Sequence, residues 1–246
     1  MIVRALGILA LAVVAPTDVA AQGLNLETLL PANDAPVSGR IIQLIILLTV
    51  LSVAPGLLMM VTCFTRLIVA LSFLRSGLGL QTTPANLILV SLALFMTFYV
   101  MAPTFDRAWK EGVQPYTEKK ITEAEAYERV TAPLRDFMLA NVREKDLVLF
   151  AELAEEKLKI KTTSEKVEMR VLIPAFMISE LRRGFEIGFL IVLPFLVIDM
   201  IVATLTMSMG MMMLPPTIIA LPFKVLFFVL IDGWHLLVGG LIRSFN

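Results

Sequence analysis

Cysteine, histidine and charged residues are all scarce in this chain. Its 246 residues include one cysteine, Cys63, and one histidine, His235. A single cysteine excludes a disulfide within the chain, and one cysteine with one distant histidine argues against a metal site or a Cys–His catalytic pair. Only 17% of the residues are charged and the formal net charge is zero, so nothing points to nucleic acid. We therefore expect no metal, no cofactor and no nucleic-acid partner.

The chain is instead rich in apolar residues. Hydrophobic residues make up 58% of it and its mean hydropathy is +0.84, whereas soluble domains have about 45–50% apolar residues. The charges are concentrated between Asp106 and Arg183, where 15 basic and 15 acidic residues lie. This contrast predicts an all-α, integral membrane-type protein with broken helix hairpins and a small helical polar domain, residues 106–183.

The N-terminal residues have the pattern of a secretory signal. Arg4 supplies a positive charge, residues 5–15 are apolar but too few to span a bilayer, and Val19-Ala20-Ala21 fits the small-x-small rule. We predict a signal peptide at residues 1–21, cleaved between Ala21 and Gln22, and a periplasmic tail at residues 22–40. The alternative is an uncleaved anchor helix.

Four apolar runs follow this tail, at residues 41–74, 86–105, 185–207 and 217–242. As one helix the first run would be about 51 Å long, against a hydrocarbon core of about 30 Å, so we predict a break or kink at Pro55-Gly56. The runs form two hairpin regions, residues 41–105 and 184–246, on either side of the polar domain. Four crossings after a cleaved signal place that domain on the periplasmic side of a bacterial inner membrane.

The polar domain carries several helix signals. Thr122 and Glu125 form a capping box, and we predict a helix that begins there and ends or kinks at Pro133. Asp146 is a suitable N-cap for a helix over Leu147–Lys159. The charges of this domain are most simply a solvated surface, with contact to a partner as the alternative.

Residues 208–216, Ser-Met-Gly-Met-Met-Met-Leu-Pro-Pro, interrupt the last hairpin region. A helix cannot pass unbroken through Pro215-Pro216, because the second proline lacks an N–H and its ring clashes with the preceding turn. Methionine is unbranched, apolar and deformable, so this Met loop suits a surface that closes without being rigid. The simpler interpretation is a turn between two membrane helices with methionine as filler.

Five charged residues lie within or at the edge of the apolar runs: Arg66, Glu186, Asp199, Lys224 and Asp232. Each would cost a few kcal/mol or more if it faced lipid, so we expect them to face protein or an aqueous path. Asp199 and Lys224 are candidates to pair across the Met-loop hairpin. Such a pair either neutralises two packed helices or forms part of a proton or ion relay.

Several of these segments resemble the FliP family. The stretch Pro174–Phe189, Pro-Ala-Phe-Met-Ile-Ser-Glu-Leu-Arg-Arg-Gly-Phe-Glu-Ile-Gly-Phe, is similar to one family signature, and Pro194–Ala203 is similar to a second. The Met loop, the segment Leu221-Pro222-Phe223-Lys224 and the pair Thr65-Arg66 also resemble the family. The resemblance extends from Ile41 to the last residue, and two long signatures in the right order are highly specific.

The resemblance implies a core subunit of the flagellar type III secretion export gate, in the flagellar basal body. In the family a pentamer of this subunit joins the partner subunits FliQ and FliR around a channel for unfolded flagellar proteins, with other export apparatus proteins and membrane lipid as further partners. The Met loop lines a constriction that seals the resting channel. Its residues here are Met209, Met211, Met212 and Met213.

The family also modifies the four-crossing topology. Its assembled complex sits largely raised out of the bilayer, so helices broken at Pro55-Gly56 and Pro194 would be hairpins packed against neighbouring subunits. The injectisome relatives of the family share these motifs, and the apparent signal peptide favours the flagellar branch.

Two other classes of function remain open. A proton-coupled small-solute transporter would use Asp199, Lys224 and Asp232, and it predicts a pocket within one chain. An intramembrane enzyme is disfavoured, because no Ser/His, Cys/His or paired-carboxylate motif stands out.

Overall fold

The regular structure of this protein is entirely helical within the residues that its computed structural model describes, which are 37–80, 84–158, 167–210 and 215–245. The chain divides into two compact units, Met1–Leu51 and Ser52–Asn246. The boundary falls inside helix α2 (Val37–Met60). All the packing described below belongs to the second unit. The predicted all-α class is confirmed.

The first apolar run is divided at Val61–Cys63, so of the predicted break or kink at Pro55-Gly56 the break is wrong. Helix α2 continues through both residues, because an embedded proline removes one helical hydrogen bond without forcing the helix to end. At the observed division the Thr62 hydroxyl accepts a hydrogen bond from the Phe64 N–H at 3.4 Å. This bond satisfies one of the free N–H groups at the start of α3 (Phe64–Gly77).

The second apolar run forms a long helical segment that extends into the polar domain. It comprises α4 (Asn86–Ala108), a π-helical turn η2 (Trp109–Val113) and α5 (Gln114–Thr117). Together these elements span 32 residues, and the segment is long and apolar enough to cross a membrane. Pro103 lies inside α4 without ending it.

Two amphipathic helices, α6 (Glu123–Asn141) and α7 (Glu144–Leu158), make up most of the polar domain. The predicted capping box is confirmed, because the Thr122 hydroxyl accepts from the Glu125 N–H and the Glu125 carboxylate accepts from the Thr122 N–H. Helix α6 does not end at Pro133 but runs on to Asn141. Asp146 is not an N-cap, since α7 begins two residues earlier and the Asp146 carboxylate instead accepts from the Ser179 hydroxyl at 2.7 Å.

Helix α8 (Met169–Ser208) is 40 residues long and passes through Pro174 and Pro194. The expected break at Pro194 is therefore wrong. The helix also crosses the sequence boundary between the polar domain and the last apolar region, at Arg183 and Gly184, without interruption. One rigid element thus joins the polar helices to the Met loop.

The broken helix pair lies further along the chain, in α9 (Pro216–Leu230) and α10 (Gly233–Arg243). The two helices meet at an angle of 65°. Asp232 takes a left-handed conformation between them, with φ of 51°, which aspartate tolerates better than most residues. Gly233 follows because a Cβ there would lie 2.3 Å from the Phe228 ring.

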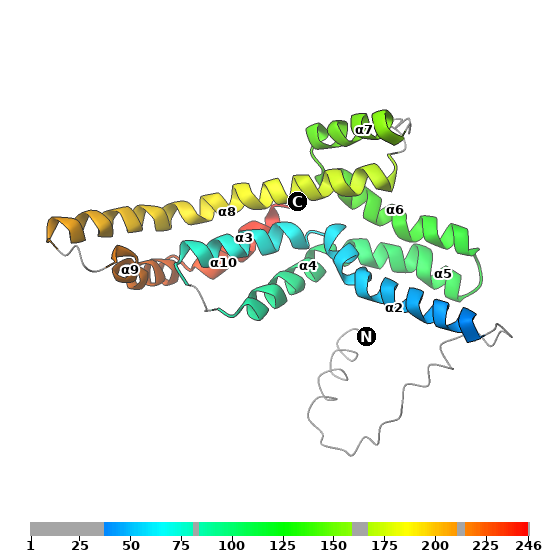
Figure 1. Cartoon of the computed structure of the whole chain (residues 1–246), viewed down its shortest axis with the longest axis horizontal. Helices are drawn as coiled ribbons and strands as arrows, with labels where there is room; N and C mark the ends of the chain where they lie inside the picture. Colours follow the sequence, from blue (N-terminus) through cyan, green and yellow to red (C-terminus); the bar gives the residue numbers. More distant parts are fainter. Residues whose placement is uncertain (1–36, 81–83, 159–166, 211–214, 246) are drawn as a thin grey trace, which may run out of the picture. The chain divides into compact units, whose positions relative to one another are not determined.

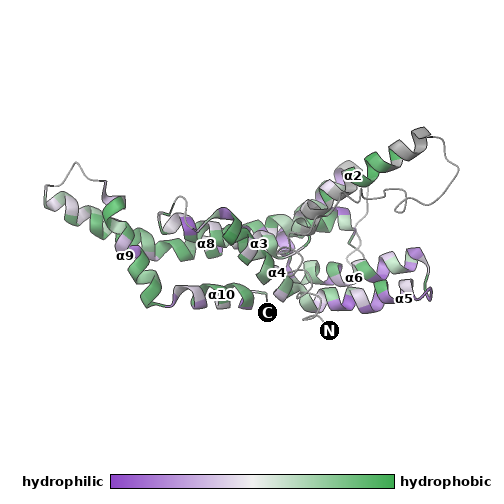
Figure 2. Cartoon of the chain, turned by 90° about the horizontal axis from the view of Figure 1, so that it is seen from below, coloured by the Kyte–Doolittle hydropathy of each residue, from purple (hydrophilic) through white to green (hydrophobic). Residues whose placement is uncertain are grey.

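The described residues contain two helical segments long and apolar enough to span a membrane, or three if the bent α9–α10 pair counts as one span. They match the second, third and fourth apolar runs. The first run is divided between the 24-residue helix α2 and α3, and the expected fourth crossing stays a prediction. Figure 2 shows hydrophilic residues gathered on α5 and α6, whereas α9 and most of α8 are hydrophobic.

The main packing contact joins α3 to α8, which run side by side in the same direction (Figure 1). Gly184 and Gly188 of α8 allow the close approach: a Cβ at Gly184 would lie 3.0 Å from the Val69 side chain, and one at Gly188 would lie 2.6 Å from the Phe73 ring. Such a small-xxx-small spacing is how helices pack tightly in apolar surroundings. The central core adds buried side chains of α4, α9 and α10, and a second cluster joins α6, α7 and the start of α8.

Candidate functional site

The Met loop connects the end of α8 to the start of α9. Met209 follows α8 directly and 70% of its surface is exposed. Gly210 then adopts a φ of 75°, a conformation that ends the helix and that glycine accepts at no steric cost. Met211, Met212 and Met213 lie outside the described residues.

Asp199 of α8 and Lys224 of α9 hold the two arms of this hairpin together. The Lys224 Nζ lies 2.5 Å from the Asp199 Oδ2 and also donates to the Gly77 carbonyl at 3.0 Å. Lys224 is buried, and Gly77 is the last residue of α3, whose carbonyl has no partner within its helix. The ammonium therefore neutralises a carboxylate and caps a helix C-terminus, as the helix dipole favours. The predicted pairing is confirmed.

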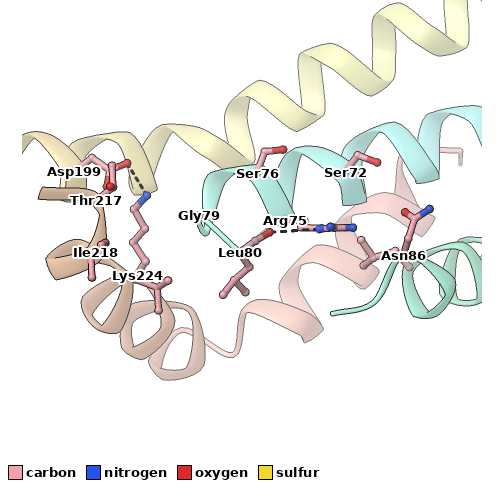
Figure 3. A pocket seen from close by; sticks show the side chains of 12 residues that line it. Ser72, Arg75, Ser76, Gly79, Leu80, Asn86, Asp199, Thr217, Ile218 and Lys224 are labelled. Carbon is pink, nitrogen blue, oxygen red and sulfur yellow. Dashed lines mark hydrogen bonds and ion pairs between the residues drawn. The ribbon is translucent and has the colours of Figure 1, made fainter. Parts of the chain in front are cut away.

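An open pocket of about 970 Å³ lies beside this ion pair (Figure 3). It is bounded by the end of α3, the start of α4, α8 and the start of α9. Most of its lining side chains are polar, and they include Ser72, Arg75, Asn86 and Thr217. A polar pocket is unusual in so apolar a chain, because polar groups are costly next to lipid.

Arg66 is the centre of a second buried charge network. Its guanidinium forms two hydrogen bonds with the Glu180 carboxylate, one of them from Nε to Oε2 at 2.9 Å, and both side chains are fully buried. The Nη1 group donates to the Ser244 carbonyl at 2.8 Å and to the Ser244 hydroxyl at 3.1 Å. The guanidinium also lies 3.7 Å from the centre of the Phe245 ring. Arg66 thus joins α3 to α8 and to the residues after α10.

Glu180 is the partner that the sequence analysis missed. It lies in the sequence Ser-Glu-Leu-Arg-Arg, where neighbouring charges make it look like part of the solvated surface. Its spacing gives a signal, because Glu180 lies four residues before Gly184 and so on the same side of α8 as the packing glycines. A charge on the packed face of an apolar helix needs a partner of opposite sign.

The other two charged candidates are exposed on this chain. Glu186 pairs with Arg182 one helical turn earlier, at 2.9 Å, on the exposed side of α8. Asp232 occupies the bend between α9 and α10 and does not line the pocket. The predicted cleavage residues, Ala21 and Gln22, lie outside the described part of the chain.

Among the residues that the structure describes, no group of three or more His, Cys, Asp or Glu side chains is placed to hold a metal ion. Cys63 is fully buried, and burial raises the pKa of its thiol to about 12. A thiol with so high a pKa is a poor nucleophile at neutral pH. Within the described residues, then, the site consists of ion pairs, a polar pocket and an apolar hairpin.

The model of the FliP family matches residues 47–241 of the chain. The chain belongs to the FliP family. It is similar to the flagellar biosynthetic protein FliP of Rhizobium meliloti, at 63% identity over 92% of each chain, and of Agrobacterium fabrum, at 64% identity over 87% of each chain. It is also similar to the flagellar biosynthetic protein FliP of Bacillus subtilis, at 50% identity over 83% of this chain and 91% of the relative.

FliP family membership makes the chain a non-enzymatic component of the flagellar export apparatus and a membrane protein of that apparatus. The structure also shows which contacts the residues of the FliP-like signature at 174–189 make. Glu180 in that signature holds Arg66, and Gly184 and Gly188 admit Val69 and Phe73 of α3. These FliP signature residues therefore build the α3–α8 contact.

Proposed function

We propose that the chain is a pore-lining subunit of the flagellar type III export gate, in which Met loops from several copies meet and seal a channel for unfolded flagellar proteins. The observation that carries this proposal is the α8–α9 hairpin. Methionine is exposed where α8 ends, at Met207 and Met209, and the ion pair of Asp199 and Lys224 fixes the two arms. A flexible ring of thioethers can close around a chain of any sequence, and an apolar constriction excludes ions by dewetting.

The exposed surface of the hairpin supports an assembly. Large apolar side chains of Ile201, Leu205, Ile218 and Phe223 are exposed on α8 and α9. Continuous apolar surface of this kind marks contact with membrane or with other proteins. In the proposed gate the contacts are made by a pentamer of this chain, by FliQ and FliR, and by lipid, within the bacterial inner membrane and the flagellar basal body.

The remaining expectations belong to the same proposal. Residues 1–21 act as a signal peptide cleaved before Gln22, and the polar domain, residues 106–183, lies on the periplasmic side. A cysteine placed at the exposed Tyr127 of α6 tests the second point. It should react in intact spheroplasts with a reagent that does not cross membranes, and reaction only after membrane disruption would contradict the proposed orientation.

The seal is tested by replacing Met211, Met212 and Met213 together with alanine. We expect normal assembly and a membrane that leaks ions, because alanine side chains leave the constriction open. The control is the double change Met59→Ala and Met60→Ala at two exposed methionines of α2, which should add no leak. Ion conductance equal to wild type in an assembled gate that carries the triple alanine change would contradict the seal.

Convergence of several Met loops is tested by oxidative cross-linking of a Met212→Cys variant. Cys63 is fully buried, so the native cysteine contributes no background. We expect disulfide-linked dimers of the chain within the purified gate. Tyr127→Cys on the polar domain serves as the control site. Complete absence of linked dimers at position 212 would contradict a ring of Met loops.

One observation favours the transporter hypothesis: the pocket beside Asp199 and Lys224 lies within one chain, as that hypothesis predicted. Asp232, the third residue assigned to it, does not line the pocket. The variant Asp199→Asn separates the two functions. Normal assembly with loss of proton coupling would favour a transporter, whereas loss of assembly or stability supports the structural role of the ion pair.

A further inference from the structure

The pocket beside Asp199 and Lys224 carries hydrogen-bonding groups along its length. In Figure 3 the labelled side chains spread from this ion pair at one end to Asn86 at the other, with Ser76 and Ser72 of α3 between them. The volume of about 970 Å³ lies within the range of about 300–1,000 Å³ that is usual for ligand sites. The pocket is thus large enough for a ligand with several polar groups.

Charged ligands of either sign fit this pocket poorly. Lys224 and Asp199 neutralise each other. Arg75 is engaged by its own chain, through the bond from its Nε to the Leu80 carbonyl and through a further interaction. The Asp199 Oδ1 is buried without a hydrogen-bond partner among the described residues and would repel an anion, whereas a cation would meet Lys224 and Arg75. We therefore expect a neutral ligand.

Unused donors and acceptors lie together in the pocket. The side chains of Ser76, Asn86 and Thr217 are exposed and form no hydrogen bond with the described parts of the chain. Hydroxyl and amide groups can both donate and accept. Asn86 and Thr217 also lie in the first turns of α4 and α9, neither of which has a side-chain cap. The free N–H groups there suit a ligand carbonyl, and the unpaired Asp199 oxygen suits a ligand N–H.

A polypeptide backbone has this combination of groups. Each residue other than proline presents one N–H donor and one C=O acceptor, and in an unfolded chain both are free to bond. None of the described residues that line the pocket is aromatic, so a sugar ring or a nucleobase would have no aromatic face to stack on. The exposed side chains of Leu87, Ile88 and Ile218 lie at the same two helix starts, where they can contact apolar side chains of a bound peptide.

We propose that this pocket binds the backbone of an extended, uncharged polypeptide segment, which belongs to an unfolded protein on its way through the export gate. Its carbonyl groups accept from the starts of α4 and α9, and its N–H groups bond to Asp199 and to the hydroxyls of α3. The source of the segment rests on the proposed function, whereas peptide binding by the single chain does not. Recognition through the backbone tolerates any sequence, which suits a route that different proteins share.

Backbone binding is tested on the full chain purified in a neutral detergent. The probe is a short peptide of serine, asparagine and alanine, acetylated, amidated and labelled with an uncharged dye, and binding is followed by fluorescence anisotropy. The comparison peptide has the same sequence with methylated backbone nitrogens. We expect its affinity to be lower by at least about tenfold, because it has lost several N–H donors. Methylation makes the peptide more apolar, so uptake by the micelle alone would change in the opposite direction.

Two variants locate the binding site. Asn86→Leu and Thr217→Val each remove a polar side chain at an exposed position of the pocket, and each should weaken binding of the unmodified peptide by about 2- to 10-fold, the usual effect of one lost hydrogen bond. The matched control is Thr204→Val, at an exposed position of α8 outside the pocket lining, which should bind like wild type. Melting temperatures show whether each variant is folded, and the comparison of the two peptides on the wild-type chain needs no variant.

The source of the segment is tested in the assembled gate. Photoreactive p-benzoylphenylalanine replaces Ile218 in the pocket lining or, as the control, Tyr127 on the exposed side of α6. An export substrate fused to a stably folded domain is stalled in transit. We expect light-dependent adducts with this substrate at position 218 and not at position 127. Adducts at position 218 with other gate chains alone would overturn the assignment to a protein in transit.

Equal affinity for the unmodified and the methylated peptide would overturn backbone binding, and so would equal losses in Thr217→Val and Thr204→Val. Failure of the pore is measured separately, as ion leak and cross-linking at the Met loop. A tight membrane in the triple alanine variant, with normal peptide binding, would refute the pore and leave the pocket. A leaky triple variant, with no preference between the two peptides, would refute the pocket and leave the pore.

Discussion

Breaking the Arg66–Glu180 pair should destabilise the protein more than any other single change to a buried charge. Both side chains are fully buried, and removal of one member of a buried pair costs about 3–5 kcal/mol because the other charge loses its partner. For a chain of this size, each kcal/mol lowers the melting temperature by about 2–4 °C. The variant Glu180→Gln should therefore melt roughly 6–20 °C below wild type.

The geometry makes the two single variants unequal. In Glu180→Gln the Arg66 guanidinium stays charged but loses its counter-charge, and it keeps only neutral acceptors, the substituted amide oxygen and the Ser244 oxygens, beside the Phe245 ring. In Arg66→Met the remaining carboxylate can take up a proton and become neutral, which a guanidinium cannot do. We therefore expect Arg66→Met to be the milder change, although it also releases Ser244.

The double variant Arg66→Met with Glu180→Leu completes the test. Replacing a whole buried pair by apolar side chains of similar size is often neutral or stabilising. The double variant should thus be more stable than Glu180→Gln, with a melting temperature in detergent close to wild type. Additive losses, in which the double variant loses the sum of what the two single variants lose, would show that the pair carries no coupled energy and would refute the reasoning.

Three further predictions concern packing, capping and burial. Gly188→Ala should cost about 1–3 kcal/mol of stability, because its Cβ would lie 2.6 Å from the Phe73 ring. Gly239→Ala, with no atom within 4 Å of its Cβ, should instead stabilise the protein by up to about 1 kcal/mol. Thermal melting measures both effects, and an equal change in melting temperature would contradict the packing of α3 on α8. Thr122→Ala should cost about 1 kcal/mol of stability through loss of the capping box. Amide hydrogen exchange in the first turn of α6 should become faster, and an unchanged exchange rate would contradict the role of the cap. Cys63 should react with a maleimide only after unfolding, because burial raises the pKa of its thiol to about 12, so rapid labelling of the folded protein would contradict its burial.

Proline was the main source of error in reading helices from the sequence. Pro55, Pro133 and Pro194 were each expected to break or kink a helix, and α2, α6 and α8 continue through them. A proline removes a single N–H donor, and its cost in a long apolar helix is offset by the packing of the whole element. The real boundary at Val61–Cys63 has no proline and depends on the Thr62 hydroxyl.

The sequence predicted contacts correctly where the contacting residues lie close together along the chain or are joined by a short turn. The capping box of Thr122 and Glu125 joins residues three apart and was predicted correctly. Asp199 and Lys224 were also paired correctly, because the Met loop brings their helices back together and both charges stand alone in apolar runs. Arg66 and Glu180 are 114 residues apart in sequence, and no nearby turn connects them. Their pairing depends on the parallel packing of α3 against α8, which one sequence does not reveal.

The buried charges and the packing glycines together fix α3 along α8 at both ends and in the middle. Arg66 joins the start of α3 to Glu180, and Gly184 and Gly188 accept the next two turns. The last carbonyl of α3, at Gly77, reaches Asp199 through Lys224. Beyond Asp199 only the final residues of α8, up to Ser208, project past this contact, a length of about 14 Å at 1.5 Å per residue. A rigid support places the end of α8, where Met209 is exposed, at a defined position, and this is what the proposed Met-loop seal requires.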